Sequence, residues 1–232
     1  MLYKETVTKA TMQMLEKLMA DPYLKDFYLV GGTNLSLRYG HRISDDIDLF
    51  THKDFDKKAL ADHMEKHYDL YWKEPKMNGY SCYPDGQKVD FYHYPSTPIK
   101  GVEEIDGNRM LSAEDVAAMK MNSIAVDGTR VKDFIDIHTV LDHIPLLDLS
   151  HVYSQKYTDR DVKEDVKMMA HHEAVEKDFP KVKVLKKQLT NQKVFGDLKQ
   201  QVKEYIKKTN QKKSNLIARN QRKTNRRKGP KL

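Results

Sequence analysis

Two aspartates separated by one residue carry the clearest chemical signal in this sequence. Asp46 and Asp48 flank Ile47 in the segment SDDIDLF. Side chains at positions i and i+2 of a β-strand point to the same face, so this spacing places two carboxylates side by side. Paired carboxylates bind Mg²⁺, which neutralises phosphate charge and aligns the attacking and leaving oxygens in phosphoryl or nucleotidyl transfer. We therefore expect Asp46 and Asp48 to be metal ligands.

A third carboxylate from a neighbouring strand would complete such a site. Asp90 is our candidate, because it alternates with apolar residues in a predicted strand. Asp45 adjoins the pair, and a shift of one residue in strand register would exchange the two faces. The apolar residues that follow, beginning with Ile47, set the phase that favours Asp46 and Asp48. A solvated acidic strand end is the alternative interpretation, because Asp-x-Asp alone is common.

A glycine turn lies shortly before the aspartate pair. Gly31, Gly32 and Thr33 follow the short apolar run at 27–30, which reads as a buried strand. The backbone N–H groups of such a turn, the Thr33 hydroxyl and the helix start that follows could bind the β- and γ-phosphates of a nucleotide. An ordinary strand-to-helix turn is the alternative. The sequence contains neither a P-loop nor a G-x-G-x-x-G fingerprint here, and the turn gains specificity from the nearby carboxylates.

The elements that position these residues follow from apolar periodicity and capping residues. We expect a first helix, capped by Thr6 or Thr8, to end near Met19, and a second helix, capped by Thr33 or Asn34, to end at Tyr39. Asp54 is the predicted cap of the next helix, and Ser112, with Asp115 three residues on, resembles a capping box. The remaining expectations are strands at 47–50, 68–73, 80–83 and 87–94, helices at 54–67, 112–126 and 130–143, two helices within 150–177, irregular chain at 95–107, and a basic amphipathic helix at 182–206 followed by flexible chain from 209.

These elements predict an α+β fold. We expect a small mixed β-sheet core with flanking helices at 1–110, a helical region at 111–180 that completes the active site, and a basic helix with a flexible tail at 181–232. The chain has one cysteine and lacks an apolar run of about 18 residues, so we expect a reducing, cytoplasmic setting without a membrane span. The N-terminus also lacks the apolar core of a signal peptide.

The net charge of +7 conceals an asymmetry between the body and the tail. Residues 181–232 carry 18 Lys and Arg against 2 Asp and Glu, a net charge of +16, which leaves −9 for the first 180 residues. Basic side chains that neutralise phosphates raise the affinity for a polyanion by releasing counterions. The tail therefore favours an RNA partner.

The order of these motifs resembles a known family, the AbiEii/AbiGii nucleotidyltransferase toxins of the DNA polymerase β-like nucleotidyltransferase superfamily. The resemblance covers roughly residues 25–142. Its motifs are, in order, Gly31-Gly32-Thr33-x-Leu35-Ser36-Leu37, then His41-Arg42-x-Ser44-x-Asp46-Ile47-Asp48-Leu49-Phe50, then Asp115-x-x-x-x-Lys120, and last Arg130-x-Lys132-Asp133-x-x-Asp136.

The resemblance implies roles for individual residues. Asp46 and Asp48 would hold the metal, and Gly32 and Thr33 would bind phosphate. Lys120 would contact the triphosphate or neutralise the leaving pyrophosphate, although most helix lysines are simply solvated. Asp133 or Asp136 would complete the active site, as a base; their alternative is salt bridging at the surface. Asp115 ranks below Lys120, because it also fits a helix cap; Arg42 could pair with Asp45 or contact phosphate.

The sequence thus supports a magnesium-dependent nucleotidyltransferase that uses a nucleoside triphosphate. By resemblance it is the toxin of a toxin–antitoxin or phage-defence (abortive infection) pair, with a cognate antitoxin and an acceptor that is an RNA such as tRNA, or a protein. A catalytically silent nucleotidyltransferase fold that binds nucleic acid through residues 181–232 is the second hypothesis. A protein that docks a partner or an anionic surface through the helix at 182–206 is the third.

Overall fold

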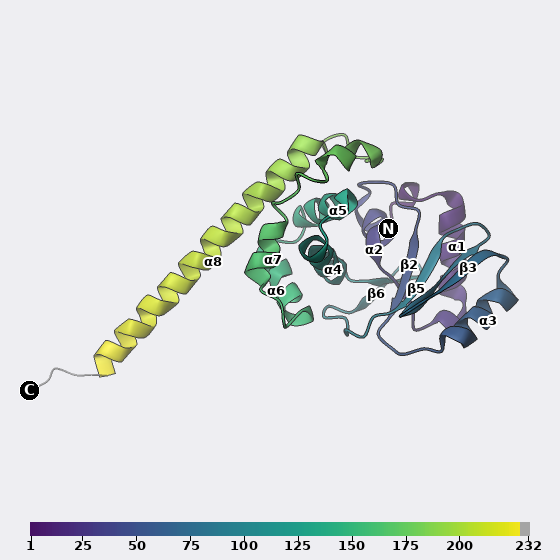
Figure 1. Cartoon of the computed structure of the whole chain (residues 1–232), viewed down its shortest axis with the longest axis horizontal. Coiled ribbons are helices and arrows are strands. Elements are labelled where there is room, and N and C mark those ends of the chain that lie inside the picture. The colour runs from purple at the N-terminus through teal and green to yellow at the C-terminus, as the bar shows by residue number, and fades with distance from the viewer. Residues whose placement is uncertain (228–232) are drawn as a thin grey trace, which may run out of the picture.

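A mixed β-sheet of seven strands forms the centre of the molecule (Figure 1). The computed structural model describes residues 1–227, with side chains up to residue 215 except residue 213. The strand order is β3-β4-β5-β2-β1-β7-β6; β2 pairs with β5 and β1 pairs with β7 in parallel, and the other neighbours are antiparallel. The strands are β1 (Tyr28–Leu29), β2 (Ile47–Thr51), β3 (Leu70–Lys76), β4 (Gly79–Pro84), β5 (Val89–His93), β6 (Val102–Ile105) and β7 (Asn108–Leu111).

Helices cover the sheet through two hydrophobic cores. One core joins α1 (Lys9–Ala20) and α3 (Lys57–His67) to the sheet. The other joins part of α2 (Gly31–Tyr39) to the C-terminal helices, which lie together beside the sheet in Figure 1. These C-terminal helices are α4 (Ala113–Val126), α5 (Val131–Leu141), α6 (Leu146–Lys156), α7 (Val162–Met168) and α8 (Asn191–Arg227). Elsewhere in the chain, short 3₁₀ helices are formed at Lys4–Thr6, Pro22–Leu24 and Glu176–Lys181. The predicted α+β class is confirmed.

Two predicted helix caps are present as side-chain hydrogen bonds. Thr8 caps α1 by accepting from the backbone N–H of Thr11 at 3.0 Å. Ser112 caps α4 by accepting from the N–H of Asp115 at 3.1 Å. Each bond satisfies one of the N–H groups that a helix leaves without an internal partner.

Two other predicted caps are wrong. The second helix begins at Gly31 rather than after Thr33 or Asn34, because a glycine with φ of +70° makes the turn and the helix follows without a side-chain cap. The cap of α3 is Asp56 rather than Asp54; its carboxylate accepts from two N–H groups of the first turn. A local pattern does not distinguish two acidic residues that are two positions apart.

The edges of the sheet also depart from the prediction. β3 continues through Pro75 to Lys76, because β3 is an edge strand and an edge tolerates the missing N–H of proline. The stretch expected to be irregular, 95–107, contains β6, the opposite edge strand. Three of its four residues are exposed, so it lacks the alternation that marks a half-buried strand. The helix after Pro145 begins at Leu146, ahead of the predicted range.

The last helix is longer than expected and begins later. Residues 182–190 are not helical, whereas α8 continues through Gly196 and past Thr209 to Arg227. The first turns of α8 bury apolar side chains such as Phe195 and Leu198 in the core. The C-terminal part of the helix extends away from the body (Figure 1). Residues 209–227, expected to be flexible chain, are helical, and residues 228–232 lie outside the described part. Within residues 1–227, no helix combines the length and apolarity needed to cross a membrane.

Candidate active site

The register between β2 and β5 places the predicted carboxylates at one cleft. Asp48 lies directly beside Asp90 in the parallel pair, and Asp46 precedes β2 by one residue. All three line a cleft of about 300 Å³ together with Gly31. Strand alternation points Asp48 and Asp90 to the same face, so the predicted third carboxylate comes from the expected neighbouring strand.

The glycine turn lies against one of these carboxylates. A Cβ atom at Gly31 would lie 2.1 Å from Asp48 Oδ2, and the residue has φ of +70°, so only glycine fits without displacement. The first helical hydrogen bond of α2 runs from Asn34 N to Val30 O at 3.4 Å. The N–H groups before Asn34 are those that an α-helix leaves without an internal acceptor. The turn therefore joins a potential anion site to the acidic cleft.

The structure assigns Thr33 a different position from the one predicted. Its side chain is fully buried, and its hydroxyl donates to the backbone oxygen of Asp46 and lies 3.0 Å from Ser44 Oγ. Thr33 does not line the cleft. Its hydroxyl fixes the segment that leads into β2 and thereby positions Asp46, so phosphate binding by this hydroxyl is not supported by the geometry.

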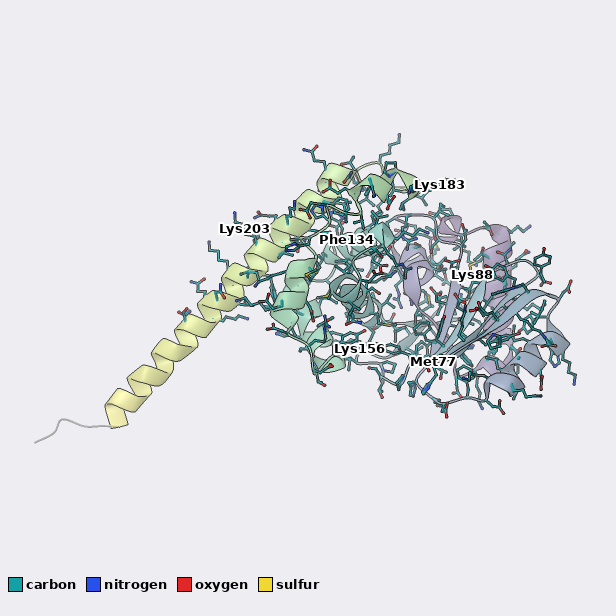
Figure 2. The ribbon with its side chains drawn as sticks, viewed as in Figure 1. Met77, Lys88, Phe134, Lys156, Lys183 and Lys203 are labelled. Atoms are coloured by element: carbon teal, nitrogen blue, oxygen red, sulfur yellow. The ribbon has the colours of Figure 1, made fainter. Side chains whose placement is uncertain are left out.

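Lys88 occupies the space between two of the carboxylates. Its ammonium lies 3.0 Å from Asp90 Oδ2 and 3.7 Å from Asp46 Oδ1, and Figure 2 labels it on the sheet. Asp90 also accepts a hydrogen bond from the Ser81 hydroxyl. Lys88 precedes β5 by one residue and stands two positions before Asp90, the spacing that places side chains of an extended chain on one face. The alternation in 87–94 contained this signal, but the prediction did not use the lysine.

The donor set suits a hard divalent cation, because carboxylate oxygens are the ligands that Mg²⁺ prefers. Among the described residues, however, no three His, Cys, Asp or Glu side chains are gathered closely enough to hold a metal ion as they stand. The Lys88 ammonium provides positive charge at the same oxygens. Metal ligation by Asp46, Asp48 and Asp90 stays a prediction, and it requires Lys88 to move.

The environment of Asp48 disfavours its charged form. Burial raises its pKa from 3.8 to about 6, the neighbouring charges of Asp90 and Asp46 act in the same direction, and Lys120 opposes them. A carboxylate in this state gains from an added cation, which removes the repulsion between like charges. The cleft is therefore a place where positive charge is stabilising.

Lys120 provides the opposite wall of the cleft from α4. Its ammonium lies 2.5 Å from Asp133 Oδ1 and 3.2 Å from Asp136 Oδ2. Burial alone would lower the pKa of Lys120, but these two carboxylates raise it above its ordinary value. Lys120 is therefore a fixed cation, held by the two aspartates that lie one helical turn apart on α5.

Asp133 and Asp136 support this wall and do not line the cleft. Asp136 is fully buried and accepts from Arg42 Nε at 2.7 Å and Arg42 Nη2 at 2.9 Å, with His41 Nε2 at 2.8 Å. Burial alone would raise the pKa of Asp136, yet the charges of Arg42 and Lys120 hold it well below its usual range. A base held in this way is not accessible to a substrate proton, so the expected catalytic role of either aspartate as a base is not supported.

The partner of the buried Arg42 side chain differs from the one predicted. Arg42 is only 2% exposed and pairs with Asp136 rather than with Asp45. A Cβ atom at Gly32 would lie 2.1 Å from Arg42 Nη2, which explains the second glycine of the turn. Asp115, the other candidate of its motif, is buried away from the cleft, where it accepts from Ile99 N and Lys100 N and pairs with Lys156.

The chain resembles solved structures in fold and one protein of known sequence. The crystal structure of JHP933 from Helicobacter pylori superposes with a TM-score of 0.56 at 19% identity, covering 91% of this chain and 98% of that one. The crystal structure of a putative nucleotidyltransferase from H. pylori has a TM-score of 0.55 at 19% identity, covering 88% of this chain and 95% of that one. The uncharacterized protein aq_aa25 of Aquifex aeolicus (strain VF5) is 32% identical over 171 residues, which is 71% of this chain and 82% of that protein.

The family itself is shown by a match over most of the chain. The sequence model of the nucleotidyl transferase AbiEii toxin, of the type IV toxin–antitoxin systems, matches residues 13–215. The chain therefore belongs to the AbiEii nucleotidyltransferase toxin family. The match includes the whole cleft and the first part of α8.

Proposed function

We propose that this protein is a magnesium-dependent nucleotidyltransferase that transfers a nucleotide from a nucleoside triphosphate to an RNA, and that it acts as the toxin of a toxin–antitoxin or phage-defence pair. The observation that carries the proposal is the junction at Asp48: the carboxylate touches the glycine turn at the start of α2 and shares its cleft with Asp46 and Asp90. Few other functions require an anion site and a carboxylate cluster at the same point.

The residues of the cleft divide the work of the reaction. Asp46 and Asp48 would hold Mg²⁺, which supplies charge neutralisation at the phosphates when bound. The N-terminus of α2 would hold the β- and γ-phosphates, and Lys120 would balance the charge that develops on the leaving pyrophosphate. The acceptor hydroxyl oxygen bonds to the α-phosphorus as the α–β phosphoanhydride bond breaks. Its proton passes to one of the carboxylates that line the cleft, and pyrophosphate leaves.

The basic helix favours RNA as the acceptor. Residues 207–232 contain 11 Lys and Arg and no Asp or Glu, and α8 carries part of this segment away from the body (Figure 1). Lys203, labelled in Figure 2, lies on the same helix nearer the body. A charged arm that extends from the body can contact phosphates that are remote from the reacting end of an RNA.

Transfer of label tests the proposal. Purified protein is incubated with each of four α-³²P-labelled nucleoside triphosphates, Mg²⁺ and total RNA, and the RNA and the protein are then separated and counted. We expect label in the RNA with the wild type and none with Asp46→Ala or Asp48→Ala. Label in protein alone would replace RNA by a protein acceptor, and the absence of label from both fractions with every nucleotide would contradict the proposal.

The second candidate is a catalytically silent protein of the same fold that binds nucleic acid. The observation that favours it is Lys88, which already neutralises Asp46 and Asp90 where a metal would be needed. This candidate predicts that toxicity in cells survives Asp48→Ala and is lost when residues 207–232 are removed. The transferase predicts that Asp48→Ala abolishes toxicity.

A further inference from the structure

The floor of the cleft changes from acidic to aromatic along the strands. Phe50 on β2 and Tyr92 on β5 lie side by side in register, two residues after the pair formed by Asp48 and Asp90. Positions two apart on a strand share a face, and all four side chains line the same cleft.

These two rings lie at the edge of the packed interior: Phe50 is a partly buried residue that packs against the core of the C-terminal helices, and Tyr92 belongs to neither core. Their neighbours on the opposite face, Leu49 and Phe91, are 1% and 0% exposed and belong to the core beneath the sheet. Phe50 and Tyr92 are instead half-buried at the cleft. Their ring centroids are 5.4 Å apart at an interplanar angle of 63°, an edge-to-face arrangement.

Surrounding residues hold the rings in place. Gly79 lies opposite Tyr92 in the β4–β5 register, and a Cβ atom there would lie 2.1 Å from the backbone oxygen of Phe91 and 2.8 Å from Tyr92 Cδ1, so this glycine leaves space for both the neighbouring strand and the ring. The ring centroids of Tyr94 and Phe50 are 5.9 Å apart, and the Tyr94 hydroxyl oxygen lies 2.8 Å from the Tyr157 hydroxyl oxygen. Contacts from both the sheet and the helical region therefore fix the positions of Phe50 and Tyr92.

We propose that Phe50 and Tyr92 form a platform on which a nucleobase stacks during nucleotide transfer. This inference rests on the proposed function. Two residues along a strand span about 6.6–6.8 Å. Phe50 and Tyr92 therefore lie about the length of a ribose away from Asp48 and Asp90, the carboxylates that would flank the α-phosphate. Aromatic faces stack on every base, because each base has a π-face. Met119 of α4 lines the same cleft and adds a polarisable apolar contact.

The nucleobase has two possible sources, the incoming triphosphate and the end of the acceptor RNA. Both present the same stacking face. A binding comparison separates them, because a non-hydrolysable nucleoside triphosphate and a short single-stranded RNA can each be titrated alone. Inorganic tripolyphosphate provides the matched control, because it carries the phosphates without a base.

The test compares these three ligands by calorimetry in Mg²⁺ for the wild type, Phe50→Ala and Tyr92→Ala. Loss of one base-stacking contact weakens binding roughly 5- to 150-fold. We expect a loss in that range for the triphosphate or the RNA, whichever supplies the base, and unchanged tripolyphosphate binding, which also shows that the variant is folded. Tyr92→Phe should recover the affinity that Tyr92→Ala loses. Tyr71→Ala, which removes a ring that is 88% exposed on β3, should have no effect.

Fluorescence gives an independent readout. The chain has a single tryptophan, Trp72, on the edge strand β3, so Phe50→Trp introduces a second emitter in the cleft that a stacked base should quench. Unchanged affinities for the base-containing ligands in both alanine variants, with no quenching, would overturn the platform while leaving the proposed function intact. Failure of the wild type to bind either the triphosphate or tripolyphosphate would overturn the proposed function, and the platform with it.

Discussion

Replacing Asp48 by asparagine should stabilise the metal-free protein while removing its metal site. Burial and the charges of Asp90 and Asp46 raise the pKa of Asp48 from 3.8 to about 6. At 1.36 kcal/mol per pH unit, this interval corresponds to about 3 kcal/mol of folding free energy that the ionised carboxylate costs above pH 6. Because asparagine keeps the shape but loses part of the hydrogen bonding, we expect a gain of ~2 kcal/mol, or roughly 4–8 °C in Tm for a chain of this size.

The pH dependence of the gain follows from the direction of the pKa change. The pKa of Asp48 is higher in the folded than in the unfolded state. Below pH 3.8 the group is neutral in both states and does not destabilise the wild-type fold, whereas above about pH 6 the full destabilisation is present. The difference in Tm between Asp48→Asn and the wild type should therefore be full at pH 7.5 and shrink as the pH falls toward 4.

Thermal unfolding with EDTA and then with Mg²⁺ checks this prediction. Asp46→Asn is the matched control, because the Asp46 side chain is 55% exposed and should change Tm little without metal. Mg²⁺ should raise the Tm of the wild type by mass action and leave Asp48→Asn unchanged. A lower Tm for Asp48→Asn than for the wild type at pH 7.5 without metal would refute the reasoning, since it would mean that the native fold uses this charge.

Three further predictions concern the walls of the cleft and the basic helix. Lys88→Met should tighten Mg²⁺ binding in the absence of nucleotide by about fivefold, or roughly 1 kcal/mol, because the ammonium competes for Asp46 and Asp90; equal or weaker binding in calorimetry would show that it does not compete. Asp136→Asn should cost ~3–5 kcal/mol in urea unfolding, because Arg42 and Lys120 keep buried charges without their main partner; a cost below about 1 kcal/mol would be inconsistent with this network. Removing residues 207–232 should weaken RNA binding and flatten its salt dependence without lowering Tm, because it deletes 11 basic side chains; an unchanged salt slope in filter binding would exclude phosphate contacts by this segment.

Local sequence patterns predicted the elements that carry the chemistry. The aspartate pair, the glycine turn and the strand around Asp90 are short segments whose alternation and turn residues define their conformation, and the structure brings them to one cleft. The neighbouring positions of β2 and β5 were the one long-range step, and it followed from the need for a third carboxylate. The caps at Thr8 and Ser112 were likewise local.

What the sequence could not provide were partners that are far apart along the chain. Arg42 and Asp136 are separated by 94 residues, and no local pattern identifies one as the counterion of the other. The buried hydroxyl of Thr33 and the displacement of Asp133 and Asp136 from the cleft also depend on how α2 and α5 pack. The edge strand β6 was not predicted, because its side chains are mostly exposed and the strand pairs with only one neighbouring strand, β7.

The most direct measurement is a crystal structure with Mn²⁺ and a non-hydrolysable nucleoside triphosphate, analysed for anomalous scattering. Mn²⁺ substitutes for Mg²⁺ at oxygen ligands. The account predicts an anomalous peak within about 2.5 Å of carboxylate oxygens of Asp46 and Asp48, Lys88 moved away from Asp46, and the β- and γ-phosphates against the N-terminus of α2. A nucleotide bound elsewhere, or a cleft that holds neither ion nor phosphate while Lys88 keeps its position, would contradict it.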